Sequence, residues 1–176
     1  MFLLQMSGVP GSGKSTLAKS ISEYIDVVII NTDIVKSAIL DIVDDIDFKY
    51  AGKVTYNIAY ALARDYLQQG KNVILDSPCL YNEGLQTGIS LAKECNAQYK
   101  YIECFLEDLD EIDKRLRQRE SYASQIKALS SDKSSIEGMR RAIYAAKRPE
   151  ETAYLVVDTL KPLEEYIEEV IEYIKR

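Results

Sequence analysis

Short apolar runs alternate with longer amphipathic stretches along this chain of 176 residues. The apolar runs are rich in Val, Ile and Leu, as is typical of strands buried on both faces of a parallel sheet. They occupy residues 2–6, 27–30, 72–75, 99–106 and 154–157. The stretches around them predict helices over 16–25, 32–40, 50–69, 83–95, 109–119, 136–146 and 162–176. This alternation predicts a three-layer α/β fold, in which a five-stranded parallel sheet has helices on both faces.

Local signals predict where the helices begin and end and which faces they bury. Thr32 is expected to cap the helix after the second strand, and Asp108 the helix at 109–119. Gly70 is expected to end the long helix at 50–69, while the acidic stretch 41–47 before that helix is expected to be a loop. The apolar stripe of the long helix is predicted to be Val54, Ile58, Ala61 and Leu62.

A glycine-rich segment follows the first predicted strand, with the sequence Gly8-Val9-Pro10-Gly11-Ser12-Gly13-Lys14-Ser15. It matches the pattern GxxxxGK[ST] and lies between a predicted strand and a predicted helix, which is the context that the motif requires. Glycine lets successive backbone N–H groups turn toward phosphate oxygens, and the positive end of the helix attracts the same anion. In such a loop Lys14 reaches the β- and γ-phosphates and the Ser15 hydroxyl binds Mg²⁺. We therefore expect ATP and Mg²⁺ here, with nucleotide contacts from Gly8, Pro10, Gly11, Ser12, Gly13, Lys14, Ser15 and Thr16.

Two carboxylates follow the second and third predicted strands, at the edge where ligands of parallel sheets bind. Asp33 shares a helix face with Lys36. It is either a cap alone or, as we favour, the base that takes the proton of an acceptor hydroxyl, with Lys36 holding an anionic acceptor. Asp76 is expected to hold Mg²⁺ or to orient the acceptor, and the alternative is a turn residue before Pro78. The chain has no histidine, so a general base has to be a carboxylate.

A basic helix leads into a polar, serine-rich stretch at 120–135 that has no periodicity. Arg115 and Arg119 are four residues apart and share a face of this helix, whereas Arg117 lies on another face. Arginines beside a mobile segment suit a lid that excludes water and brings positive charge to a transferring phosphoryl group. The alternative is a solvated basic surface that pairs with Glu107 and Glu120.

Composition narrows the classes of function. The net charge of −6 argues against a broad nucleic-acid surface. The chain contains no apolar run of 18 residues, which is the length that a membrane span requires. The first residues lack the basic segment of a signal peptide, so we expect a cytoplasmic protein. The three cysteines show no CxxC spacing and are expected to be free thiols. Tyr56, Tyr60 and Arg64 recur at helical spacing and are either core residues or part of an acceptor pocket.

Together these motifs resemble small P-loop kinases of the nucleoside-monophosphate-kinase-like superfamily, such as the polynucleotide 5′-kinase kinase domain, chloramphenicol phosphotransferases, gluconate kinases and zeta toxins. The resemblance rests on GVPGSGKST at 8–16, NTDIVK at 31–36, VILDSP at 73–78, KRLRQR at 114–119 and VVDTLKP at 156–162. It implies the strand order 2-3-1-4-5, Asp33 as the base and Arg115 or Arg119 as the lid arginine. It also implies that the turn at 158–161, with Thr159, lies near the adenine.

Two departures from these families bear on the acceptor. The polynucleotide kinases carry Asp-x-x-Arg after strand two, whereas Lys36 here lacks the bidentate fork of arginine. Asp76 is followed by Ser77, not by the second carboxylate that motor-type ATPases use to activate water. The sequence thus predicts one domain, 1–176, with a lid at about 115–140, that transfers the γ-phosphate of ATP to a hydroxyl, with a small-molecule acceptor favoured. The alternatives are a polynucleotide 5′-hydroxyl kinase and a nucleotide-binding switch or slow NTPase.

Overall fold

The computed structural model describes residues 1–176 and contains one parallel sheet of five strands. The strands are β1 (Phe2–Ser7), β2 (Val28–Asn31), β3 (Val73–Asp76), β4 (Gln98–Phe105) and β5 (Leu155–Asp158). Their order across the sheet is β2-β3-β1-β4-β5, and every neighbouring pair is parallel. β1 is central, so that Leu4 pairs with Ile74 of β3 on one side and with Lys100 of β4 on the other. Both the predicted fold class and the strand order implied by the resemblance are confirmed.

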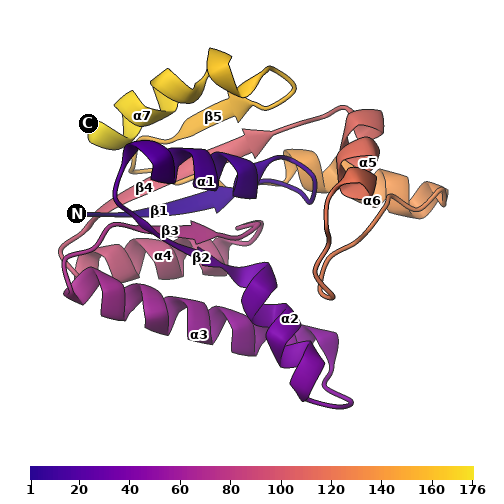
Figure 1. The fold of residues 1–176 in the computed structure, drawn as a ribbon, viewed down its shortest axis with the longest axis horizontal. Helices are drawn as coiled ribbons and strands as arrows, with labels where there is room; N and C mark the ends of the chain where they lie inside the picture. The colour runs from indigo at the N-terminus through magenta and orange to yellow at the C-terminus, as the bar shows by residue number, and fades with distance from the viewer.

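Seven α-helices surround the sheet and complete the three layers (Figure 1). They are α1 (Lys14–Tyr24), α2 (Thr32–Ile42), α3 (Phe48–Gln68), α4 (Asn82–Glu94), α5 (Leu109–Gln118), α6 (Lys133–Tyr144) and α7 (Ile167–Lys175), with a short 3-10 helix η1 (Leu163–Glu165) before α7. Helices α1 and α7 cover one face, and α3 and α4 cover the other. Helices α2, α5 and α6 lie toward the carboxyl ends of the strands (Figure 1).

Alternate residues of β1 belong to two different cores because successive side chains of a strand point to opposite faces. Leu4 and Met6 pack against α1 and α7 in a cluster that includes Leu17. Leu3 lies in a second cluster with residues of α3 and α4 such as Leu67. All six residues of β1 are buried, which explains its largely apolar sequence, and the two polar ones, Gln5 and Ser7, have side-chain hydrogen bonds.

Two helix starts differ from the sequence prediction. The cap of α2 is Asn31, whose side-chain oxygen accepts from the backbone N–H groups of Asp33 and Ile34. Thr32 is already the first residue of α2, and its hydroxyl donates to the backbone carbonyl of Asp76 instead. Helix α3 begins earlier than predicted because Asp47, expected in a loop, caps it by accepting from the N–H of Tyr50.

The predicted apolar stripe of α3 is wrong. The buried residues of this helix are Ala51, Thr55, Ala59, Ala63 and Leu67, at a spacing of four. Of the predicted stripe, Ile58 is 37% and Leu62 is 40% exposed. Small side chains let a helix approach the sheet closely, so the interface selects the alanine face over the face with larger apolar residues.

A third hydrophobic cluster includes residues of α5 and α6, the helices on either side of the predicted lid segment. Ile112 and Leu116 of α5 and Ile143 of α6 pack on Val9 and Leu106. Helix α6 starts three residues earlier than predicted, at Lys133, because Asp132 caps it. Residues 119–132 between the two helices contain no helix or strand, and we call this segment the α5–α6 connection. The C-terminal stretch predicted as one helix is divided into η1 and α7. None of the helices has the length and apolarity that crossing a bilayer would require.

Candidate active site

The glycine-rich segment forms a tight loop between β1 and α1. Gly8, with φ of 134°, leaves no room for a side chain, since a Cβ there would lie 2.5 Å from the carbonyl oxygen of Cys104. Gly13 has φ of 88° and serves as the N-cap of α1. Both positions need glycine because L-residues with side chains rarely adopt such backbone angles. The loop is thus held tightly against β4.

The first turn of α1 is open to an anion. No side chain caps this helix, and its first turn holds no acidic residue. Helices α2, α3, α5 and α6 are capped by Asn31, Asp47, Asp108 and Asp132, whereas α4 and α7 also lack a side-chain cap but have an acidic residue in the first turn. The hydroxyl of Ser12 is buried in the loop without a hydrogen-bond partner. Free N–H groups at a helix start and an unpartnered loop hydroxyl are what a bound phosphate would satisfy. The predicted contacts Pro10 and Thr16 border this loop, Pro10 half-buried and Thr16 exposed.

Lys14 lies at the centre of the charged groups around the loop. Its ammonium donates to the carbonyl of Val9 at 3.0 Å. Burial lowers the pKa of Lys14, and the carboxylates of Asp76 and Asp33 act in the opposite direction. Lys14 is therefore close enough to both predicted carboxylates to interact with them, as expected for one shared site.

Ser15 and Asp76 fit a magnesium ion. Burial raises the pKa of Asp76, while the Ser15 hydroxyl and Lys14 oppose that rise. A hydroxyl beside a buried carboxylate offers the oxygen donors that Mg²⁺ prefers, and phosphate oxygens and waters usually complete its shell.

Asn31 connects the two carboxylates, although the sequence drew attention to it only as part of NTDIVK. It pairs with Asp76 in the parallel register of β2 and β3. Its side-chain NH₂ donates to Oδ2 of Asp76 at 2.8 Å, and its side-chain oxygen accepts from the N–H of Asp33 at 2.9 Å. One amide thereby fixes the start of α2, which carries Asp33, relative to Asp76.

The two predicted lid arginines, Arg115 and Arg119, have different hydrogen-bond partners. Arg115 donates from Nη2 to the carbonyl of Thr159 at 2.8 Å and from Nε to Glu111 at 2.9 Å. Burial lowers the pKa of Arg119 and Asp33 raises it, while Arg119 lowers the pKa of Lys14, so Arg119 lies within electrostatic range of the charged site. The Nε of Arg119 is buried and has no hydrogen-bond partner. Arg119 is thus the arginine with a free donor beside the phosphate loop, and Arg117 instead pairs with Asp113 on the surface.

Two further predicted contacts are occupied within the protein. The hydroxyl of Thr159 is buried and donates to the carbonyl of Ser12 at 2.9 Å, so it stabilises the backbone of the phosphate loop. Lys36 places its ammonium 3.2 Å from the ring centre of Phe48. Burial lowers the pKa of Lys36, and Asp33 opposes this effect. Lys36 is therefore near Asp33, as its spacing predicted, while its charge is held over an aromatic ring.

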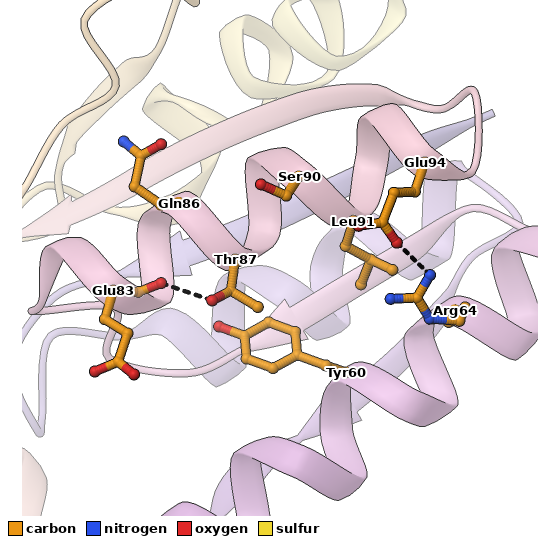
Figure 2. Close-up of a pocket in the computed structure, with 8 residues that line it drawn as sticks. All are labelled: Tyr60, Arg64, Glu83, Gln86, Thr87, Ser90, Leu91 and Glu94. Carbon is orange, nitrogen blue, oxygen red and sulfur yellow. Dashed lines mark hydrogen bonds and ion pairs between the residues drawn. The ribbon is translucent and has the colours of Figure 1, made fainter.

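One hollow in the surface lies elsewhere, between α3 and α4, with a volume of about 340 Å³ (Figure 2). Tyr60 and Arg64 line it, but their polar groups are engaged: Tyr60 donates to the carbonyl of Gly84 at 3.0 Å, and Arg64 pairs with Glu94. We do not assign it a ligand. Tyr56 stacks on Tyr60 with ring centres 6.1 Å apart; burial raises its pKa, with Asp33 among the smaller causes. Of the three residues in this group, Tyr56 is the one near the charged site.

The carboxylate of Asp33 contacts a residue that the sequence did not single out. Nε2 of Gln125, in the α5–α6 connection, donates to Oδ2 of Asp33 at 2.5 Å. Ser124 beside it contacts α2 as well. No local pattern marks these residues, because they lie in the stretch without periodicity. The thiols take no part in a disulfide, and burial raises the pKa of Cys79 and of Cys104 to about 12.

The strand order and the glycine-rich loop define a protein with a P-loop fold. A family model described as an AAA domain matches residues 3–146. The chain belongs to this AAA-domain family. No curated protein sequence matches the chain.

Solved kinase structures share the fold at low sequence identity. A putative kinase from Chloroflexus aurantiacus is 19% identical with a TM-score of 0.78, over 98% of this chain and 97% of that one. A gluconokinase from Sinorhizobium meliloti is 17% identical with a TM-score of 0.62, over 99% and 92% of the two chains. The Mycobacterium tuberculosis APS kinase in complex with AMPPNP and APS is 16% identical with a TM-score of 0.64, over 99% and 98%. The architecture is that of the small P-loop kinases that the motifs resemble.

Proposed function

We propose that this protein is an ATP-dependent phosphotransferase that moves the γ-phosphoryl group of ATP to a hydroxyl of a small molecule. The observation that carries the proposal is the uncapped phosphate loop with Lys14, together with Asn31, which links Asp76 to the backbone of Asp33. The effects of Asp33, Asp76 and Arg119 on the pKa of Lys14 support one shared charged site. Two cations suited to phosphate and two carboxylates suited to a metal and a proton form the minimal set for phosphoryl transfer. The solved structures with this fold include a gluconokinase and an APS kinase, which are named for small-molecule acceptors.

Each residue has one role in the proposed reaction. The acceptor hydroxyl oxygen attacks the γ-phosphorus, the bond to the oxygen of ADP breaks, and the hydroxyl proton passes to the carboxylate of Asp33. Lys14 and the backbone N–H groups of the loop hold the phosphates, and Arg119 neutralises charge on the transferring group. Ser15 and Asp76 would hold Mg²⁺, which shields phosphate charge when it is bound.

Asp33→Asn tests this proposal because Asn preserves size and removes the ability to take a proton. Helix α2 stays capped in this variant, since its cap is Asn31. We expect ATP affinity and melting temperature near wild type, with acceptor-stimulated ADP release lower by about 100-fold or more. The acceptor is first sought by screening hydroxyl compounds, including sugars, nucleosides and a 5′-hydroxyl oligonucleotide, for stimulated ADP release.

Asp41→Asn is the matched control, because Asp41 is exposed on the same helix. If Asp33→Asn and Asp41→Asn both kept the wild-type rate of acceptor-stimulated ADP release, Asp33 would not be the general base. Slow hydrolysis that no acceptor stimulates, and that Asp33→Asn leaves unchanged, would instead identify a nucleotide switch.

A further inference from the structure

The α5–α6 connection reaches across to the first turn of α2 and touches it through adjacent residues. Gln125 donates from Nε2 to Oδ2 of Asp33. The backbone N–H of Ser124 donates to the hydroxyl of Ser37 at 3.0 Å, and the Ser124 hydroxyl donates to the carbonyl of Asp33 at 3.1 Å. These contacts join parts of the chain about 90 residues apart, so they are tertiary contacts and do not belong to the capping of α2.

In its hydrogen bond with Asp33, Gln125 is the donor, as the hydroxyl of a bound acceptor would be. An acceptor hydroxyl has to donate its hydrogen toward the base and to lie within hydrogen-bond reach of it. The amide of Gln125 does the same toward Oδ2 of Asp33. An amide N–H and an acceptor O–H compete for this oxygen because both are donors directed at the same place.

The segment that carries Gln125 is held by polar contacts that can open. Ile126 and Tyr122 in the connection are 43% and 44% exposed, so little apolar surface fixes it to α2. Arg119 also holds this part of the connection, because its Nη2 donates to the carbonyl of Ile126 at 3.0 Å. The arginine within range of the charged site therefore also holds the residue next to Gln125. Further along the connection, Leu129 packs on the third cluster and its N–H donates to Asp113 at 2.7 Å.

We propose that Gln125 occupies the position of the acceptor hydroxyl at Asp33 and keeps water from using this base until an acceptor displaces the amide. This inference rests on the proposed function, because it assigns Gln125 a role at the same base. Gln125 is a positioning residue that sets the preference for acceptor over water. Without it, a water oxygen would attack the γ-phosphorus, the bond to ADP would break, and the water proton would pass to Asp33, giving ADP and phosphate.

The first test uses ATP, Mg²⁺ and water alone, so it needs no identified acceptor. Gln125→Ala should hydrolyse ATP roughly tenfold faster than wild type, a fraction of the 10²–10⁴-fold that a general base contributes. The increase should disappear in the double variant with Asp33→Asn. Gln118→Ala is the matched control, since Gln118 is exposed at the end of α5, and it should hydrolyse at the wild-type rate.

The second test measures the contact without turnover, by hydrogen exchange of residues 120–128. Gln125→Ala and Asp33→Ala should each speed exchange several-fold, and the double variant should be no faster than either one, because both remove the same bond. Gln125→Glu, which keeps the length of the side chain but repels Asp33, should also speed exchange. Additive effects of the two single changes would mean that the contact is absent and would overturn the inference.

The outcomes separate the inference from the proposed function. Hydrolysis unchanged or slower in Gln125→Ala, with acceptor-stimulated turnover still dependent on Asp33, overturns the role of Gln125 alone. An increase that persists in the Asp33→Asn background also overturns it, since the effect then does not pass through this base. No ADP from any variant with any acceptor overturns the proposed function, and the inference with it.

Discussion

Arg115 lies in the last turn of α5 and Arg119 directly follows this helix, and the structure predicts different effects when each is removed. Arg115 donates to the carbonyl of Thr159, and the hydroxyl of the same Thr159 donates to the carbonyl of Ser12 in the phosphate loop. Arg115 therefore supports the loop through Thr159. Arg119 has no such partner and leaves its Nε free beside Lys14 and Asp33.

The expected cost of Arg115→Ala follows from the one bond to a buried group. Thr159 is 2% exposed, and hydrogen bonds that involve a charged donor contribute about 1.5–3 kcal/mol. We use the lower end, about 1.5 kcal/mol, because the side chain of Arg115 is 28% exposed. In a chain of this size about 1 kcal/mol lowers the melting temperature by roughly 2–4 °C, so we expect a decrease of about 3–6 °C. ATP should also bind more weakly, since the loop loses its support.

The assay compares three alanine variants by melting temperature, ATP-induced stabilisation and ADP release. Arg119→Ala should melt and bind ATP almost like wild type, while its turnover falls about 100-fold or more, because its charge acts mainly in the transition state. Arg117→Ala is the control, as Arg117 pairs on the surface and its side chain is 61% exposed. If Arg115→Ala melted like Arg117→Ala and bound ATP normally, the assignment of Arg115 to loop support would be wrong.

Two further predictions concern the phosphate loop and its metal. Lys14→Ala should leave the melting temperature of the free protein unchanged but remove most of the stabilisation by ATP, which for wild type at 100 times its Kd is about 2.7 kcal/mol; an undiminished stabilisation would show that Lys14 does not hold the nucleotide. Ser15→Ala should raise the Mg²⁺ concentration needed for half-maximal stabilisation by ATP, and an identical titration curve would place Ser15 outside the metal shell.

The strands and the phosphate loop could be predicted because their signals are local. A strand buried on both faces requires an apolar run, and the loop requires glycines at fixed spacing before Lys14. The buried face of α3 could not be predicted in the same way. Hydrophobicity favoured the side with Ile58 and Leu62, whereas close approach to the sheet favoured the face with Ala59 and Ala63. That choice depends on the distance between layers, which no single segment specifies.

In the candidate site as well, residues with local sequence signals could be predicted, whereas a residue placed by long-range packing could not. Lys14, Asp33 and Asp76 could be predicted because the loop that carries Lys14 follows β1, Asp33 lies just beyond β2 and Asp76 ends β3. The carboxyl ends of parallel strands meet at one edge of the sheet. Gln125 could not, because its partner is 92 residues away and the stretch around it has no periodicity. Its position is set by the packing of α5 and α6 on Val9 and Leu106, far from the contact itself in sequence.

The two halves of the site are held by interactions of different strength, which suggests how they would act in catalysis. Asp33 and Asp76 are fixed to each other through Asn31 and the β2–β3 register, so the proposed base and metal residue move as one unit. Arg119 stands where the α5–α6 connection begins and Gln125 lies within it, and that connection meets α2 through hydrogen bonds to Asp33 and Ser37. In the proposed mechanism, one displacement of the connection would both free Asp33 and reorient Arg119. Acceptor selection would then reside in the connection, and phosphate and metal binding in the rigid sheet edge.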